Sequence, residues 1–195
     1  MENHQYYQLV DNCLKKIGCC NTEGFHFFTL ENHGLSDWQK LKRDNHLQEC
    51  CEWLKKNDYQ VYNLDEVDEQ ILEQIKNSHY SEFQNELNPE IFFEQSSTKP
   101  LANISSVVVR HKKLVAYTLI FKSTDNGVIL EHIATSSDTR NSGAIILALT
   151  YSCDCFFENN YSKCTFAIHP SNLESNSIKS IFENYFQMSE ATMKN

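Results

Sequence analysis

Three segments with β-strand character follow one another in this chain with only short turns between them, at residues 104–110, 114–121 and 128–134. The middle segment has the strongest strand pattern of the sequence, because it is rich in apolar, β-branched and aromatic residues. Asp125-Asn126-Gly127 predicts a hairpin turn before the third segment. A helix rich in small and apolar residues is expected at 142–159. Strands in series followed at once by a helix indicate an α/β chain with a mixed sheet.

The remaining elements extend this order on both sides. A strand at 59–64 and a helix at 65–86 precede the three strands, and a strand at 163–168 and a helix at 174–186 follow the helix at 142–159. The fold class expected from this order is α/β, of the α+β type with a mixed sheet. The domain that carries it is expected at residues 58–195.

Residues 1–57 are expected to form an N-terminal extension. They contain an amphipathic pattern at 6–17, a short strand at 25–30 and a helical pattern from Ser36 through Leu54. These elements need a surface on which to bury their apolar faces. The sequence leaves open whether the extension caps a cleft, forms a homo-oligomer contact or is an independent module.

The net charge of the chain limits the classes of partner that it is expected to bind. The 26 acidic residues outnumber the 17 Lys and Arg residues, which gives a net charge of −9 and argues against nucleic acid as a partner. A cationic partner suits this charge, although acidity also favours solubility. The sequence has no run of about 18 apolar residues and no signal-peptide pattern, so we expect no membrane partner and a cytoplasmic location.

The eight cysteines do not have the spacing of a metal site. No CxxC pair occurs, so we expect no metal and reduced thiols that pack as small apolar groups. Cys153, Cys155 and Cys164 leave an acyl-cysteine nucleophile as an alternative interpretation.

The connection between the strand at 128–134 and the next helix is a candidate binding loop. It contains Arg-Asn-Ser-Gly-Ala-Ile at 140–145. A helix N-terminus has unpaired backbone N–H groups and a partial positive charge, so a pyrophosphate can bind there if the backbone is accessible. Gly143 allows that approach, and Arg140 adds charge. An ordinary strand–helix connection with a glycine at a tight point explains the same residues.

This element order, together with the loop, resembles the GNAT N-acetyltransferase superfamily over about residues 59–190. That family has Gln/Arg-x-x-Gly-x-Gly/Ala at the loop; Arg140 and Gly143 match it, whereas Ile145 replaces the last small residue. In its last helix the family has Leu-Tyr-Glu-Lys, where this chain has Ile-Phe-Glu-Asn at 181–184, so Phe182 replaces the tyrosine.

The resemblance implies a GNAT-like acyltransferase fold with an N-terminal α/β extension, and acetyl-CoA as co-substrate without a metal. Backbone N–H groups at 141–145 would hold the pyrophosphate, and the strand at 133–135 would pair with the pantetheine arm. The implied cofactor-binding residues are Ile133, Ala134, Thr135, Arg140, Asn141, Ser142, Gly143, Ala144, Ile145 and Asn172.

Two residues are candidates for proton transfer. Acidic residues on the strand before the loop act as the base in some family members, often through water, which implies this role for Glu131. A charged residue at an exposed strand end is the alternative, and strand alternation predicts that His132 points to the opposite face. Tyr185, three residues after Phe182 on the last helix, is the candidate acid, with water as an alternative.

Two functions follow from the resemblance. The first is an N-acetyltransferase that transfers acetyl from acetyl-CoA directly to an amine of a small molecule, peptide or protein. The second is a catalytically degenerate GNAT-like protein that binds a partner or CoA, which Ile145 and Phe182 favour.

Overall fold

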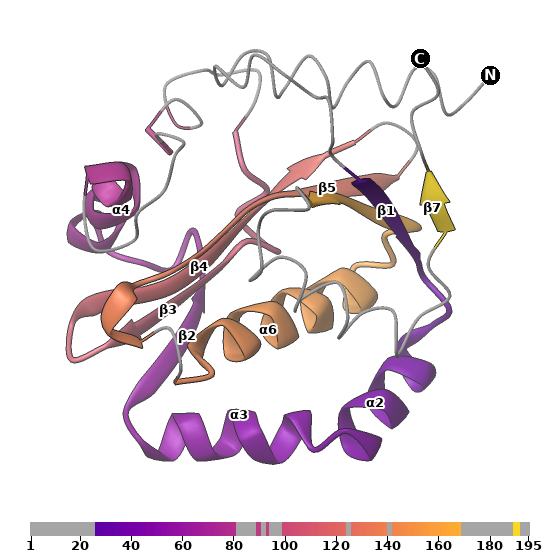
Figure 1. Ribbon diagram of the computed structural model, residues 1–195, viewed down its shortest axis with the longest axis horizontal. Helices are drawn as coiled ribbons and strands as arrows, with labels where there is room; N and C mark the ends of the chain where they lie inside the picture. The colour runs from indigo at the N-terminus through magenta and orange to yellow at the C-terminus, as the bar shows by residue number, and fades with distance from the viewer. Residues whose placement is uncertain are drawn as a thin grey trace.

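The computed structural model describes residues 26–80, 89–90, 93, 99–123, 126–139, 142–168 and 189–191 (Figure 1). Within them seven strands form one sheet in the order β2-β3-β4-β5-β6-β1-β7. The strands are β1 His26–Glu31, β2 Tyr59–Asn63, β3 Ser106–Arg110, β4 Lys113–Lys122, β5 Gly127–Thr135, β6 Lys163–Ile168 and β7 Ser189–Ala191. β5 and β6 run parallel and the other paired strands of this sheet are antiparallel, which confirms the expected mixed sheet.

Helices cover both faces of the sheet (Figure 1). α6 (Ala144–Glu158) packs on one face, and α2 (Leu35–Asp44) and α3 (Leu47–Lys56) lie on the side of α6 away from the sheet. α4 (Glu69–Lys76) packs on the opposite face. Because α6 lies between the sheet and two helices, its small and apolar composition is buried on both sides. None of the described helices is long and apolar enough to cross a membrane.

Two expected helices differ from the structure. The pattern from Ser36 to Leu54 forms two helices, because the chain turns at Asn45 and His46, where His46 has a φ of 55°. The helix expected at 65–86 begins only with α4, and the chain continues after it as a 3-10 helix, Asn77–Tyr80. The helices expected at 6–17 and 174–186 lie outside the described residues.

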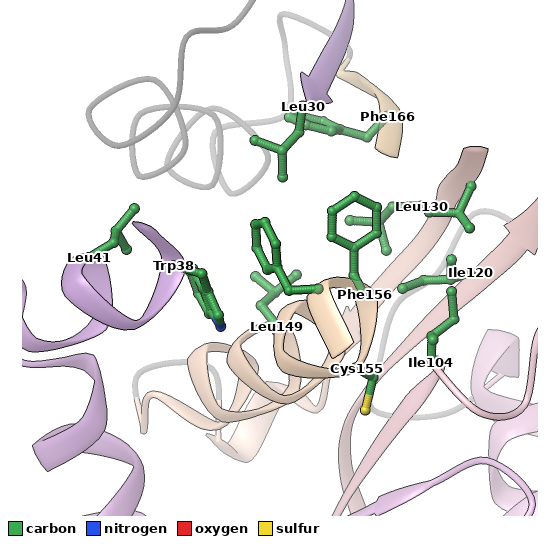
Figure 2. Packing of buried hydrophobic residues seen from close by; sticks show 12 residues of the cluster. Leu30, Trp38, Leu41, Ile104, Ile120, Leu130, Leu149, Cys155, Phe156 and Phe166 are labelled. Atoms are coloured by element: carbon green, nitrogen blue, oxygen red, sulfur yellow. The ribbon is translucent and has the colours of Figure 1, made fainter. Parts of the chain in front are cut away.

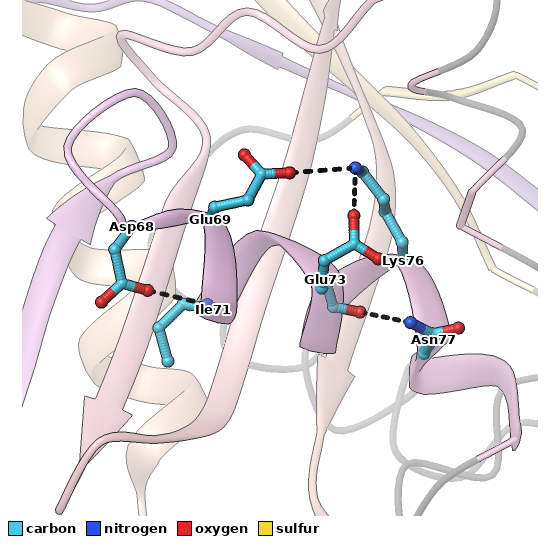
Figure 3. Close-up of polar contacts among 6 residues, drawn as sticks. All are labelled: Asp68, Glu69, Ile71, Glu73, Lys76 and Asn77. Carbon is cyan, nitrogen blue, oxygen red and sulfur yellow. Dashed lines mark hydrogen bonds and ion pairs between the residues drawn. The ribbon is translucent and has the colours of Figure 1, made fainter.

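Local hydrogen bonds set both ends of α4 (Figure 3). The Asp68 carboxylate accepts a hydrogen bond from the backbone N–H of Ile71 at 2.9 Å, so the helix begins directly after Asp68. At the other end, the Asn77 side-chain amide donates to the carbonyl of Glu73 at 2.9 Å. These contacts mark the two ends of α4, and residues 81–86 of the expected helix lie outside the described residues.

The N-terminal strand β1 lies inside the sheet, between β6 and β7. The hydroxyl groups of Thr29 in β1 and Thr165 in β6 are hydrogen-bonded at 3.0 Å. Leu30 of β1 and Trp38 of α2 share one apolar cluster with Phe156 of α6 (Figure 2). Residues 26–56 therefore share the sheet and the core with the rest of the described chain, while the domain boundary at residue 57 stays a prediction.

Candidate active site

The two parallel strands of the sheet separate partway along β5. β5 pairs with β6 over Gly127–Leu130, and no further pairs with β6 follow within the described residues. On its other side β5 stays paired with β4 as far as Thr135. The 133–135 segment therefore has one edge without a strand partner among the described residues, and an extended ligand could hydrogen-bond to it. This is the segment expected to pair with the pantetheine arm.

A β-bulge lies at the point where the strands separate. Leu119 of β4 pairs with His132, whereas the next β4 residue, Ile120, pairs with Leu130. Glu131 is therefore an extra residue in β5, and a bulge of this kind redirects side chains. The expectation that Glu131 and His132 point to opposite faces rested on regular alternation, which this bulge interrupts.

Glu131 is held in an environment that disfavours its charge. Burial raises the pKa of its carboxyl to about 7. Its Oε1 atom is buried and has no hydrogen-bond partner among the described residues. This environment does not agree with the alternative of a solvated charge at a strand end. A carboxyl group with this pKa can take up a proton near neutral pH.

His132 belongs to the packing of the sheet on its α4 face. Its ring stacks on Tyr117 with the ring centroids 5.5 Å apart, and burial lowers its pKa to about 4. The Tyr117 hydroxyl shares a hydrogen bond of 2.7 Å with Ser78 of the 3-10 helix. His132 is therefore neutral at physiological pH. Its stacking on Tyr117 gives it a role in the packing of the sheet.

The connection from β5 to α6 is held by short hydrogen bonds. The Ser136 N–H donates to the Val115 carbonyl of β4 at 2.8 Å, which ties the start of the loop to the sheet. The Ser142 N–H and hydroxyl both donate to the Thr139 carbonyl, at 2.8 and 2.6 Å. These bonds fix the described parts of the connection, residues 136–139 and 142–143.

Gly143 stands directly before α6 with a φ of 81°, a conformation that is strained for residues with a Cβ. The Ala144 N–H donates to the Ser142 hydroxyl at 3.3 Å. The N–H groups of Gly143 and Ile145 have no acceptor within the described residues. They lie at the positive end of a helix of 15 residues, which is a favourable place for an anion.

Ile145 is where the loop departs from the family pattern. Its side chain is partly buried and packs against two apolar clusters that α6 shares with the sheet and with α2 and α3. The N–H group that the expected site uses belongs to the backbone. The isoleucine side chain therefore packs in the core, and the backbone N–H of Ile145 is still present as a donor.

Sequence reasoning missed the neighbour of this loop. A Cβ placed on Gly143 would stand 3.8 Å from Leu54 Cδ1 and 3.9 Å from Cys50 Sγ, so α3 packs against the start of α6. No motif in the sequence links these segments. The amphipathic pattern of the helix showed only that it needed a partner surface.

Several expected site residues lie outside the described residues. These are Arg140, Asn141, Asn172, Tyr185 and also Phe182. The roles implied for them stay predictions, whereas Glu131, the 133–135 segment and the start of α6 are brought to the same end of β5.

The surroundings of Cys153, Cys155 and Cys164 disfavour the thiolate that an acyl-cysteine nucleophile needs. Burial raises the pKa of the Cys153 thiol, that of Cys155 to about 11 and that of Cys164 to about 12, so these thiols are protonated at neutral pH. Across the part of the chain that the structure describes, no group of three or more His, Cys, Asp or Glu residues could hold a metal ion.

Comparison with known proteins gives matches at the level of structure. No family model and no curated protein matches the sequence. Naa50 of Arabidopsis thaliana, solved with the bisubstrate analogue CoA-Ac-MVNAL, aligns with a TM-score of 0.50 and 12% identity, over 63% of this chain and 80% of that one. The ribosomal-protein-S18-alanine N-acetyltransferase of Escherichia coli aligns with a TM-score of 0.50 and 14% identity, over 63% and 74%.

A GCN5-related N-acetyltransferase of Sphaerobacter thermophilus aligns with a TM-score of 0.54 and 6% identity, over 92% of this chain and 53% of that one. This chain thus spans about half the length of that protein. Identities this low are evidence about the fold alone. The element order, the separation of β5 from β6 and these alignments agree, and this chain is therefore a strongly divergent example of the GNAT N-acetyltransferase fold.

Proposed function

We propose that this protein is an N-acetyltransferase that uses acetyl-CoA and transfers the acetyl group directly to an amine of a small molecule, peptide or protein. The observation that carries the proposal is the Glu131 carboxyl, buried without a partner for Oε1 among the described residues, at the bulge where β5 leaves β6. A cytoplasmic location, and no nucleic-acid or membrane partner, go with this proposal.

Two backbone features support a site for CoA. The open edge of β5 at 133–135 suits the amide groups of a pantetheine arm, which need donors and acceptors in an extended row. The N–H groups of Gly143 and Ile145 suit a pyrophosphate. Both features use main-chain atoms, so they tolerate the sequence divergence of this chain.

The remaining chemistry is proton transfer. An amine must lose a proton before its nitrogen bonds to the thioester carbon, and the Glu131 carboxylate accepts that proton directly or through water. Acetyl-CoA would supply the activated acetyl group. As the carbon–sulfur bond breaks, the thiolate takes a proton from Tyr185, the predicted acid, or from water. The products are an acetylated amine and CoA with a free thiol.

The test is amine-dependent release of the CoA thiol, with the acetylated product identified by mass spectrometry. The amine panel contains polyamines, small monoamines and peptides with free N-termini, and the net charge of −9 favours cationic members. Glu131→Gln is expected to lower the rate by about 10²–10⁴-fold while acetyl-CoA still binds. Acetyl-CoA binding without thiol release for any amine contradicts the enzyme and favours the binding protein that Phe182 suggests.

A further inference from the structure

Trp53 of α3 is a large apolar side chain left in contact with solvent. It is 58% exposed, whereas the other tryptophan of the chain, Trp38, is 3% exposed. Leu35 of α2 is the other exposed large apolar residue in the described segments, at 41%. An indole at this exposure contributes little to the packing of the core, and it is available for contact with a ligand.

Trp53 lies next to the α3 surface that contacts the start of α6. Cys50 and Leu54 are the α3 side chains beside Gly143. In a helix with about 100° per residue, Trp53 is displaced by roughly 60° from Cys50, on the side away from the buried Leu54. Trp53 is therefore an exposed large apolar side chain beside the Gly143 contact on this helix.

We propose that Trp53 forms the platform on which the adenine ring of CoA stacks. This inference rests on the proposed function, because it needs a pyrophosphate at Gly143 and Ile145. A pyrophosphate held there leaves the adenosine at the surface of the protein, beside the helix that carries Trp53. Proteins commonly bind a solvent-exposed base by stacking it on an aromatic side chain.

Exposed charges of both signs lie next to Trp53 on the surface of α3. Lys56 is three residues after Trp53 and Glu49 is four residues before it, so both share its face of the helix. Lys55 is about 200° from Trp53 around the helix and points away from it. The aromatic surface of Trp53, with Lys56 beside it, is therefore the feature of α3 that suits a nucleoside.

The test compares CoA with 4′-phosphopantetheine, which keeps the pantetheine arm and one phosphate but lacks the adenosine 3′,5′-bisphosphate part of CoA. Trp53→Ala is expected to weaken CoA binding by about 5- to 100-fold and to leave 4′-phosphopantetheine binding unchanged. Leu35→Ala removes a similarly exposed apolar side chain from α2, and it is expected to change neither affinity.

Tryptophan fluorescence gives a second readout. CoA is expected to quench the emission of the wild-type protein, and 4′-phosphopantetheine is not. In Trp53→Phe the remaining emission comes from the buried Trp38, so the quenching should disappear.

Each other result overturns the inference in a distinct way. Equal CoA affinity of Trp53→Ala and wild type removes the adenine platform and leaves the proposed function intact. Absence of CoA binding to the wild type contradicts both the adenine platform and the proposed function. A changed oligomeric state of Trp53→Ala with unchanged CoA affinity assigns Trp53 to a contact between copies of the chain, which also contradicts the platform.

Discussion

Leu54 of α3 packs beside Gly143 at the start of α6, and a Cβ on Gly143 would lie 3.8 Å from Leu54 Cδ1. Leu54 is fully buried, in a cluster that includes Ala144 and Leu147 of α6. A helix that the sequence places in an N-terminal extension thus supports the helix end where an anion is expected to bind. The candidate site depends on both parts of the chain.

Gly143→Ala tests whether the backbone at this helix end matters for binding. The added Cβ meets only ordinary contacts, so the cost arises from the φ of 81° and is expected to be about 1–2 kcal/mol of unfolding free energy. Because the loop must relax, CoA affinity should also fall. The measurements are chemical denaturation and calorimetric titration with CoA.

Gly34→Ala is the matched control for that substitution. Gly34 also has a positive φ, of 104°, and has no atom within 4 Å of an added Cβ. It precedes α2 and has a ψ of 156°, a backbone region essentially restricted to glycine, so alanine is expected to cost at least as much stability there as at Gly143. No change in CoA affinity is expected. Equal losses of CoA affinity in the two variants would contradict a special role for Gly143.

The rate of acetyl transfer should rise with pH through about 7. Glu131 acts as a base only when it is ionised, and its pKa is raised to about 7 by burial. The measurement is kcat/KM between pH 5.5 and 8.5 with an amine whose own pKa lies well outside this range. A profile that shows no ionisation near pH 7 would remove Glu131 from the role of base.

Glu131→Gln should also make the protein more stable at high pH. The folded-state pKa lies above the ordinary value of 4.5, so the folded protein loses stability as pH rises from about 4.5 to about 7. Glutamine removes this cost, and the gain at pH 8 is expected to be on the order of 1–3 kcal/mol. Thermal unfolding of both proteins at pH 4 and pH 8 measures it, and an equal difference at the two pH values would refute the explanation.

Leu30→Ala tests whether β1 is part of the core. Leu30 is 3% exposed and packs with residues of α2, α6 and β6, so its truncation is expected to cost about 2–5 kcal/mol. Leu35→Ala makes the same chemical change at an exposed position and should cost less than about 0.5 kcal/mol. Denaturant titrations that give equal stabilities for the two variants would contradict the place of β1 in the sheet.

Much of the fold could be predicted because its signals are local. The strands at 114–121 and 163–168 and the helix at 142–159 were expected within about two residues of their observed bounds, from apolar runs and turns. The place of β1 could not be predicted, since Thr29 and Thr165 are 136 residues apart and no local pattern specifies such pairing. The break at His46 was missed because no glycine or proline marks it.

The candidate site was predictable only in part for the same reason. Gly143 and Glu131 were found from residue type and position in the strand–loop–helix order. The bulge at Glu131 depends on the register between β4 and β5, which a single sequence does not show. The contact of α3 with Gly143 depends on packing between segments about 90 residues apart in the chain.

Calorimetric titration with acetyl-CoA tests the central claim most directly. We predict micromolar binding by the wild type that is lost in the double variant Arg140→Glu, Gly143→Trp, in which a negative charge and a bulky ring replace the predicted anion contacts. Circular dichroism of the double variant serves to show that it still folds. No binding to the wild type at millimolar acetyl-CoA would contradict the assignment of this chain as an acetyltransferase.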